Sequence, residues 1–313
     1  MEGLVKILED KRKICYACVR AGPVNEIKVA ADHSYPVVVP ERCIGCGSCI
    51  KACNPDAIVY RDSRSEVRKL LKSGKEIAIT LDPTISAEFP DINDYRKLVK
   101  MLRELGFKYV MDTAFGVDLV AAAYNRLLSD FKGKYYIFAN DPVVNNYIRK
   151  FQPELISNLA PIVTPALASA SVIRNIHGKE TAVVFVGPLI ASKAKAEMGN
   201  GEGKLDAVLT FEELRELFRE YSIDQKQLEF SDFDPPFGNK GLLFPIAEGF
   251  LHAAGIGQDL LEDKVTTVEG ELEMKESLKE FQESIDIINS HFNIFYNEYL
   301  MGTGTSSGGQ KYI

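Results

Sequence analysis

The chain has 313 residues, of which 46% are hydrophobic and 26% are charged, and this balance is typical of a soluble protein with room for two domains. The net charge of −7, with scattered Lys and Arg, argues against nucleic acid or an anionic membrane as the main partner. No apolar run approaches the roughly 20 residues of a membrane span, and the N-terminus lacks the apolar stretch of a signal peptide, so we expect a cytoplasmic protein.

Residues 1–62 are expected to form a small unit of their own. Two cysteine-containing segments are separated by strand-like stretches over residues 26–29 and 35–39. The polar residues 62–65 are typical of a linker to the rest of the chain.

All six cysteines lie at or before position 53, and four of them form a C-x2-C-x2-C-x3-C run. These four are Cys43, Cys46, Cys49 and Cys53. The spacing is that of iron–sulfur ligands, and Gly45 and Gly47 allow a tight turn that leaves backbone amides free to point at sulfides. Dense cysteine use without a secretory signal favours metal over disulfides.

Beyond the linker, short β-branched stretches alternate with amphipathic ones, a pattern typical of α/β layers. Strands are expected over residues 76–81, 109–112, 135–139, 182–186 and 206–210. Helices are expected over residues 94–105, 116–131, 166–176, 190–198, 211–221 and 274–299, and another begins near Asp141 and Pro142, with Asp141 as a candidate cap. The pattern predicts an α/β body in two lobes over residues 63–300 and a Gly/Ser-rich tail over 301–313.

The segment over residues 13–23 contains Cys15 and Cys18 and resembles half of a bacterial two-cluster ferredoxin. That family places further cysteines at the positions of Arg12 and Gly22, and both are absent here. In such ferredoxins the fourth cysteine of each run binds the other cluster. The resemblance therefore implies a ferredoxin-like domain with two incomplete ligand sets.

Each set implied in this way holds three thiolates. One set is Cys15, Cys18 and Cys53, and the other is Cys43, Cys46 and Cys49. Three outcomes stay open: two incomplete clusters, of three irons or completed by water or another ligand; a single cubane in which Cys53 rearranges to join the second set; or one occupied site, with Cys15 and Cys18 as ordinary thiols. We expect one or two 4Fe-4S clusters, or a 3Fe-4S form.

Several stretches of the body carry a second resemblance. They are residues 138–165, residues 185–197, Asp206-Ala-Val-Leu-Thr-Phe-Glu-Glu-Leu214, Phe233-Asp-Pro-Pro-Phe-Gly238 and residues 298–310. In these stretches the chain resembles the large subunit of iron-only (FeFe) hydrogenases, especially the branch that joins a ferredoxin domain to a sensory or putative hydrogenase. The resemblance covers essentially the whole chain and implies a hydrogenase-like α/β fold and an anaerobic source.

The chain departs from that family at the active-site cluster. The cysteines that hold this cluster fall here on Asp141, on Leu189 and within residues 302–307, and the neighbour that relays protons falls on Asn140. None of these positions is a cysteine. Without the thiolates, the cluster and its di-iron unit have no anchor, so we do not expect hydrogenase activity.

If the family arrangement holds, a group of polar residues converges on the vacated cleft. The group is Asn140, Asp141, Lys193, Lys195 and Glu197. Asp141 could bind a hard metal ion or act as a base. In the alternative interpretation, Asp141 caps a helix and the lysines form a solvated helix face.

Three functions therefore compete. The favoured one is an iron–sulfur protein that transfers electrons or senses redox state and acts with a redox or signalling protein partner. The second is an enzyme of unknown chemistry at the vacated cleft, so whether the chain is an enzyme stays open. The third is a scaffold whose cluster only stabilises the N-terminal unit, which is small for an independent core.

Overall fold

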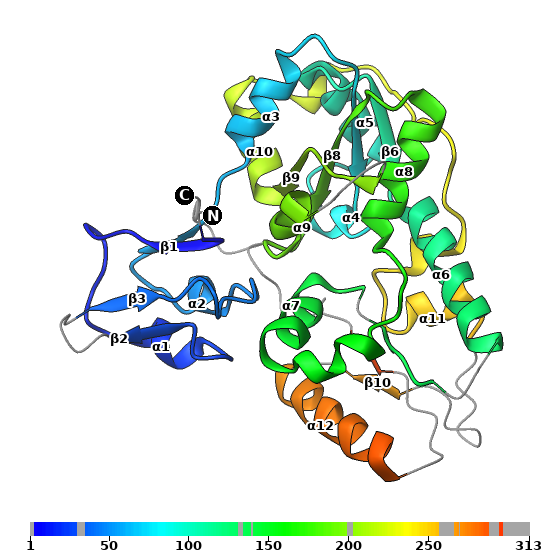
Figure 1. Cartoon of the computed structure of the whole chain (residues 1–313). Helices are drawn as coiled ribbons and strands as arrows, with labels where there is room; N and C mark the ends of the chain where they lie inside the picture. Colours follow the sequence, from blue (N-terminus) through cyan, green and yellow to red (C-terminus); the bar gives the residue numbers. More distant parts are fainter. Residues whose placement is uncertain are drawn as a thin grey trace.

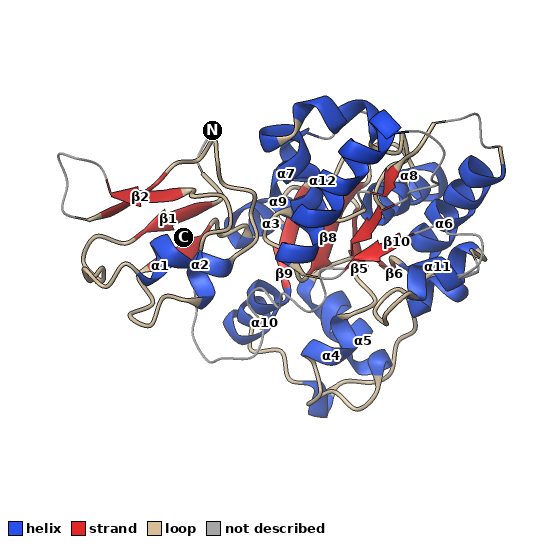
Figure 2. Cartoon of the chain, turned by 90° about the horizontal axis from the view of Figure 1, so that it is seen from below, coloured by secondary structure: helices blue, strands red, loops and turns tan. Residues whose placement is uncertain are grey.

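The computed structural model describes residues 3–29, 35–130, 134–138, 140–198, 203–256, 266–268, 270–287 and 294–296. A small N-terminal unit lies beside a larger α/β body (Figure 1), and the view from below shows the same arrangement (Figure 2). No helix among the described residues is long and apolar enough to cross a membrane.

The N-terminal unit repeats the order strand, helix, strand. The first repeat comprises β1 (Val5–Ile7), α1 (Ala17–Ala21) and β2 (Ile27–Val29), and the second comprises β3 (Pro36–Val38), α2 (Ser48–Lys51) and β4 (Ile58–Tyr60). Antiparallel pairing joins β1 to β4 and β2 to β3, so each small sheet takes one strand from each repeat. The strands expected over residues 26–29 and 35–39 are confirmed as β2 and β3, whereas β1 and β4 were not expected.

A four-stranded parallel sheet organises the first lobe of the body. Its order is β6 (Tyr109–Asp112), β5 (Ile77–Leu81), β8 (Ala182–Gly187) and β9 (Ala207–Thr210). Apolar side chains of the sheet, Ile79 among them, pack on one face against helices α3 (Arg64–Leu71), α4 (Ile85–Glu88), α5 (Tyr95–Leu105) and α10 (Phe211–Glu220). The opposite face, including Ala78, packs against α8 (Pro165–His177). Both faces are buried, as parallel sheets require.

The second lobe is built around a smaller parallel sheet of β10 (Thr266–Val268), β11 (Ile294–Tyr296) and β7 (Ile137–Phe138). Its core includes side chains of α7 (Pro142–Phe151) and α12 (Glu271–Ile287). A further apolar cluster around Tyr124 and Phe250 joins α6 (Ala114–Ser129), α8 and α11 (Gly249–Ala254). The remaining elements are α9 (Ser192–Met198) and the 3-10 helices η1 (Pro153–Asn158), η3 (Gln225–Gln227) and η4 (Lys240–Leu243). The two-lobed α/β body is therefore present.

Two expectations from the sequence are wrong. The helix expected over residues 274–299 ends at Ile287, and Ile294–Tyr296 forms a strand because its β-branched and aromatic residues pair with β7. The segment over residues 62–65 is not an exposed linker: α3 begins at Arg64, and the Ser63 side chain is fully buried. The tail over residues 301–313 and the loop over 199–202 lie outside the described residues.

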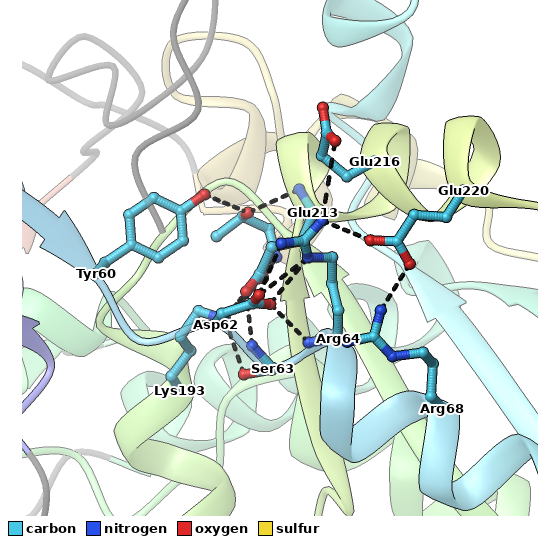
Figure 3. Close-up of polar contacts among 10 residues, drawn as sticks. Tyr60, Asp62, Ser63, Arg64, Arg68, Lys193, Glu213, Glu216 and Glu220 are labelled. Atoms are coloured by element: carbon cyan, nitrogen blue, oxygen red, sulfur yellow. Dashed lines mark hydrogen bonds and ion pairs between the residues drawn. The ribbon is translucent and has the colours of Figure 1, made fainter. Parts of the chain in front are cut away.

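A buried ion pair holds this junction together. Lys193 and Glu213 are both fully buried, and the Lys193 ammonium lies 2.7 Å from one Glu213 carboxylate oxygen (Figure 3). The ammonium also contacts the Ser63 hydroxyl at 2.8 Å and donates to the Val208 carbonyl at 3.1 Å. Burial lowers the pKa of Lys193, and the Glu213 carboxylate opposes this effect.

The same carboxylate receives two backbone N–H groups from different segments. The Ser63 N–H donates to Glu213 at 2.8 Å, and the Thr210 N–H does so at 2.7 Å as part of a capping box at the start of α10. Tyr60, at the end of β4, forms a hydrogen bond of 2.9 Å with the Thr210 hydroxyl. The chain leaving the N-terminal unit is therefore fastened to the sheet of the body.

Removing one partner of this pair should be far more damaging than removing both charges. We expect Lys193→Met to lower the free energy of unfolding by about 3–5 kcal/mol, because it leaves a buried carboxylate without its cation. The double variant Lys193→Met/Glu213→Gln should recover much of this loss, since an amide oxygen still accepts a backbone N–H. Urea unfolding followed by circular dichroism measures both, with the exposed Lys226→Met as control. Equal destabilisation by single and double variants would contradict this role.

Another ionisable group lies at the carboxyl end of β6. The Asp112 carboxylate accepts a hydrogen bond from the Ala114 N–H at 2.7 Å. Burial raises the pKa of Asp112 from 3.8 to about 6, and the charges of Asp82 and Asp118 add to the rise. The folded chain therefore holds a proton on Asp112 at pH values where the unfolded chain has released it.

This shift predicts a pH dependence of stability. Between pH 4 and pH 6 the folded state binds more protons than the unfolded state, so Asp112 should lower the free energy of unfolding as pH rises, by about 3 kcal/mol above pH 6. Asp112→Asn should remove this loss and be more stable than the unmodified chain at pH 7, measured by urea unfolding at pH 4, 5, 6 and 7. Asp94→Asn should instead be less stable than the unmodified chain at pH 7, because the Arg96 side chain lowers the pKa of Asp94 to about 2 and the folded state therefore favours the ionised carboxylate. An unchanged profile in Asp112→Asn would refute the prediction.

Candidate iron–sulfur site

The cysteines lie on the two helices of the N-terminal unit and in the loops that adjoin them. Cys43 and Cys46 lie in the loop between β3 and α2, Cys49 lies in α2 and Cys53 follows it. All four are buried, with exposed fractions of 3–6%. The loop turns at Gly45 and Gly47, whose φ angles of 81° and 75° confirm the tight turns expected at these glycines.

The first repeat of the unit holds the other two cysteines. Cys18 is buried in α1 and Cys15 is exposed just before it, and α1 packs against α2. An open hollow of 430 Å³ adjoins Cys15, and Lys13 and Asn54 are among the residues that line it. None of the six cysteines, which all lie in the described part of the chain, forms a disulfide.

Electrostatic contributions show which cysteines influence one another most strongly, and they also link the two repeats, because Cys18 contributes to the raised pKa of Cys49. Burial raises the pKa of Cys43 to about 11 and raises that of Cys49 still more, and the neighbouring Cys46 contributes to both shifts. Burial also raises the pKa of Cys18, and there the largest charge contribution comes from Cys53. Cys53 therefore lies close enough to influence the α1 cysteine, as the ferredoxin spacing implies.

Backbone N–H groups are directed at several sulfur atoms. The Ala57 N–H donates to Cys53 Sγ at 3.3 Å, and N–H groups of Gly45 and Val19 oppose the pKa rise of Cys43 and Cys18. Such donors stabilise thiolates that bind metal, and metal binding replaces the thiol protons. Buried thiols with amide donors therefore fit an iron–sulfur cluster. Among the described residues, no group of three or more His, Cys, Asp or Glu side chains is arranged to hold a single metal ion. An iron–sulfur cluster has a different requirement, because each thiolate binds a separate iron.

The cysteine loop packs directly against the body. A Cβ added to Gly45 would lie 2.9 Å from Ala191, just before α9, so only glycine allows this approach. On α7, the Asn146 side-chain amide donates to the Ile44 carbonyl at 3.1 Å, and the Lys150 ammonium donates to the Cys43 carbonyl at 2.7 Å. The candidate site is therefore attached to the body on two sides.

The residues expected at the vacated hydrogenase cleft have mixed roles. Asp141 caps α7, accepting the Val143 N–H at 2.6 Å, so the helix-cap interpretation is confirmed. Lys193 is neither part of an open cleft nor on a solvated helix face, because its ammonium is fully buried in the junction with Glu213. Asn140 is buried, and its side-chain polar atoms have no hydrogen-bond partner among the described residues.

The side chains of Lys195 and Glu197, and residues 302–307, lie outside the described part of the chain.

Glu26 is the site residue that the sequence did not single out. It directly precedes β2, is only 2% exposed, and contributes to the raised pKa values of Cys43 and Cys49. A signal was present in the sequence: the position lacking its ferredoxin cysteine, Gly22, lies four residues before an acidic side chain that is long enough to reach back.

Comparisons with known proteins agree with this arrangement. The family model described as "Iron only hydrogenase large subunit, C-terminal domain" matches residues 75–296, and the model described as "4Fe-4S binding domain" matches residues 36–59. The fold is similar to that of an FeFe-hydrogenase, HydA(deltaEFG), with a TM-score of 0.61 and 16% identity over 80% of this chain and 84% of that one. A variant of the FeFe-hydrogenase HydA1 from Chlamydomonas reinhardtii gives a TM-score of 0.60 and 17% identity over 78% of this chain and 85% of that one.

Curated relatives are similar in sequence over part of their length. The chain is 26% identical to NADP-reducing hydrogenase subunit HndD of Solidesulfovibrio fructosivorans, over 68% of this chain and 42% of that protein. It is 25% identical to Iron hydrogenase 1 of Clostridium pasteurianum over 58% of this chain and 36% of that protein. It is 26% identical to Protein NAR1 of Arabidopsis thaliana over 74% of this chain and 58% of that protein. The chain thus spans 36–58% of the length of these relatives. The large-subunit family model matches most of the chain, and the 4Fe-4S binding domain precedes the matched region. This iron–sulfur protein therefore belongs to the iron-only hydrogenase large-subunit family.

Proposed function

We propose that the chain transfers electrons or senses redox state through iron–sulfur chemistry in its N-terminal unit, and that its hydrogenase-like body binds a redox or signalling protein. One observation carries this proposal: the buried cysteine loop packs against α7 and Ala191 of the body, while no cysteine follows Cys53 in the chain. Redox chemistry is then concentrated where the two parts meet. We place their division between residues 62 and 63.

The proposed ligands form two sets, Cys43, Cys46 and Cys49 in one and Cys15, Cys18 and Cys53 in the other. An iron–sulfur cluster, when bound, supplies one-electron uptake and release. The grouping is supported by the order of the electrostatic contributions: Cys46 and Cys43 raise the pKa of Cys49 more than Cys18 does, and Cys53 raises the pKa of Cys18 more than Cys15 does. Burial excludes water from the first set, and the Gly45 and Ala57 N–H groups lower the cost of thiolate charge there and in the second set.

The other candidate functions receive less support from the described residues. Asp141 is engaged as a helix cap and Lys193 in a structural ion pair, so neither is available as an acid, base or ligand at an open cleft. Hydrogenase activity is not expected, because the chain has no thiolate beyond Cys53 to anchor an active-site cluster.

Ligand substitution tests the proposed sets. After anaerobic reconstitution, we expect Cys46→Ser and Cys15→Ser each to lower bound iron and sulfide by about half, because each removes a ligand of a different cluster. Iron and sulfide analysis with EPR of the reduced protein makes the measurement, and Ser48→Ala, at the start of α2, is the control. An unmodified chain that binds no iron would refute the proposed function.

The link between redox state and the body can be measured separately. Amide hydrogen exchange in α7 should differ between the oxidised and reduced chain, and Asn146→Ala should reduce this difference because it removes the hydrogen bond to the Ile44 carbonyl. If iron removal unfolded residues 3–62 while reduction left α7 unchanged, the cluster would be only a structural support.

A further inference from the structure

The Glu26 carboxylate is buried without a hydrogen-bond partner. Its exposed fraction is 2%, and neither Oε1 nor Oε2 has a partner among the described residues. Burying a charged group is costly unless it is paired, hydrogen-bonded or bound to metal. This carboxylate therefore lacks the compensation that buried acids ordinarily have, and a bound cation would supply it.

The carboxylate occupies the space into which a side chain at position 22 would project. A Cβ added to Gly22 would lie 2.5 Å from both Glu26 carboxylate oxygens and 2.7 Å from Cδ. The ferredoxin spacing places at position 22 the cysteine that would complete the set of Cys43, Cys46 and Cys49. Glu26 thus brings an anionic donor to the location of the missing thiolate.

Electrostatics places Glu26 beside the same three-cysteine set. Its charge contributes to the raised pKa of both Cys43 and Cys49. Cys53, the other candidate for completing this set, accepts the Ala57 N–H and is coupled to Cys18. The Lys150 ammonium donates to the carbonyl oxygens of Cys43 and Pro40 and makes no hydrogen bond to Glu26.

We propose that Glu26 is the fourth protein ligand of a 4Fe-4S cluster held by Cys43, Cys46 and Cys49, with a carboxylate oxygen on the iron that lacks a thiolate. This inference rests on the proposed function. A carboxylate is a harder donor than a thiolate and binds iron of such a cluster less strongly. The iron bound by Glu26 is then the most easily lost, by oxidation of the 2+ cluster to a 1+ three-iron cluster with release of Fe²⁺ and one electron, which ferricyanide accepts.

The first test needs no substitution at Glu26. The full chain with Cys15→Ser, which disables the other ligand set, is reconstituted anaerobically with ⁵⁷Fe and examined by Mössbauer spectroscopy. The expected spectrum has one iron site in four that differs from the rest, with the higher isomer shift of oxygen ligation. A cluster of four equivalent sulfur-bound irons, or a three-iron cluster from the outset, would overturn the proposal.

The second test compares variants at Glu26 in the same background. Glu26→Gln keeps the shape but loses the anionic donor, and should accelerate ferricyanide conversion to the three-iron EPR signal on the order of 10-fold or more. Glu26→Ala/Gly22→Cys should convert more slowly than the background protein, because it restores a thiolate. Gly22 has a φ of −75°, which cysteine adopts readily, and the Glu26→Ala substitution removes the obstructing carboxylate.

Two controls separate ligation from other effects. Glu41→Gln removes an exposed acid next to the cysteine loop and should leave the conversion rate unchanged. His33→Ala removes the histidine of residues 30–34, which lie outside the described part of the chain, and should also change nothing. Loss of the fourth iron in His33→Ala but not in Glu26→Gln would overturn the proposal. Absence of any iron in the unmodified chain would instead overturn the proposed function itself.

Discussion

The buried ion pair between Lys193 and Glu213 is the interaction on which the assembly of this chain depends. The Glu213 carboxylate belongs to the capping box of α10 and accepts a hydrogen bond from the Ser63 N–H. It also neutralises the buried ammonium of Lys193, which lies in α9. Such a pair contributes little net stability compared with apolar residues of the same volume. Removing either partner, however, leaves a buried charge without compensation and is strongly destabilising. The hydrogen bond from Ser63 to Glu213 consequently fixes the direction in which the chain passes from the N-terminal unit into the body.

A second attachment turns this junction into a defined interface. The cysteine loop approaches Ala191 so closely that Gly45 has no space for a side chain, and Asn146 and Lys150 of α7 bind its carbonyl oxygens. Ser63 and Gly45 therefore contact the two ends of the same short stretch, residues 191–193. These contacts hold the cysteine loop directly on the body rather than through a flexible tether.

Much of the fold was predictable where local pattern and tertiary packing agree. The helix of Tyr95–Leu105 carries its apolar residues at helical spacing and buries Leu98, Met101, Leu102 and Leu105, and the four strands of the main sheet are apolar runs that only a doubly covered sheet can bury. Prediction failed where distant segments decide the outcome. Ile294–Tyr296 is a strand because β7 and β10 offer edges to it, and Ser63 is buried because Glu213 accepts its N–H.

The sequence by itself determined the iron–sulfur character of the N-terminal unit, the α/β body, and the absence of cysteine beyond Cys53, since ligand spacing, periodicity and residue identity are local properties. Only the tertiary structure decided that Lys193 is internal rather than solvated, that Cys53 is coupled to Cys18, and that Glu26 fills the space beside Gly22. Each of these facts depends on which distant group lies opposite a side chain, and that is set by packing between segments whose separation along the chain carries no such information.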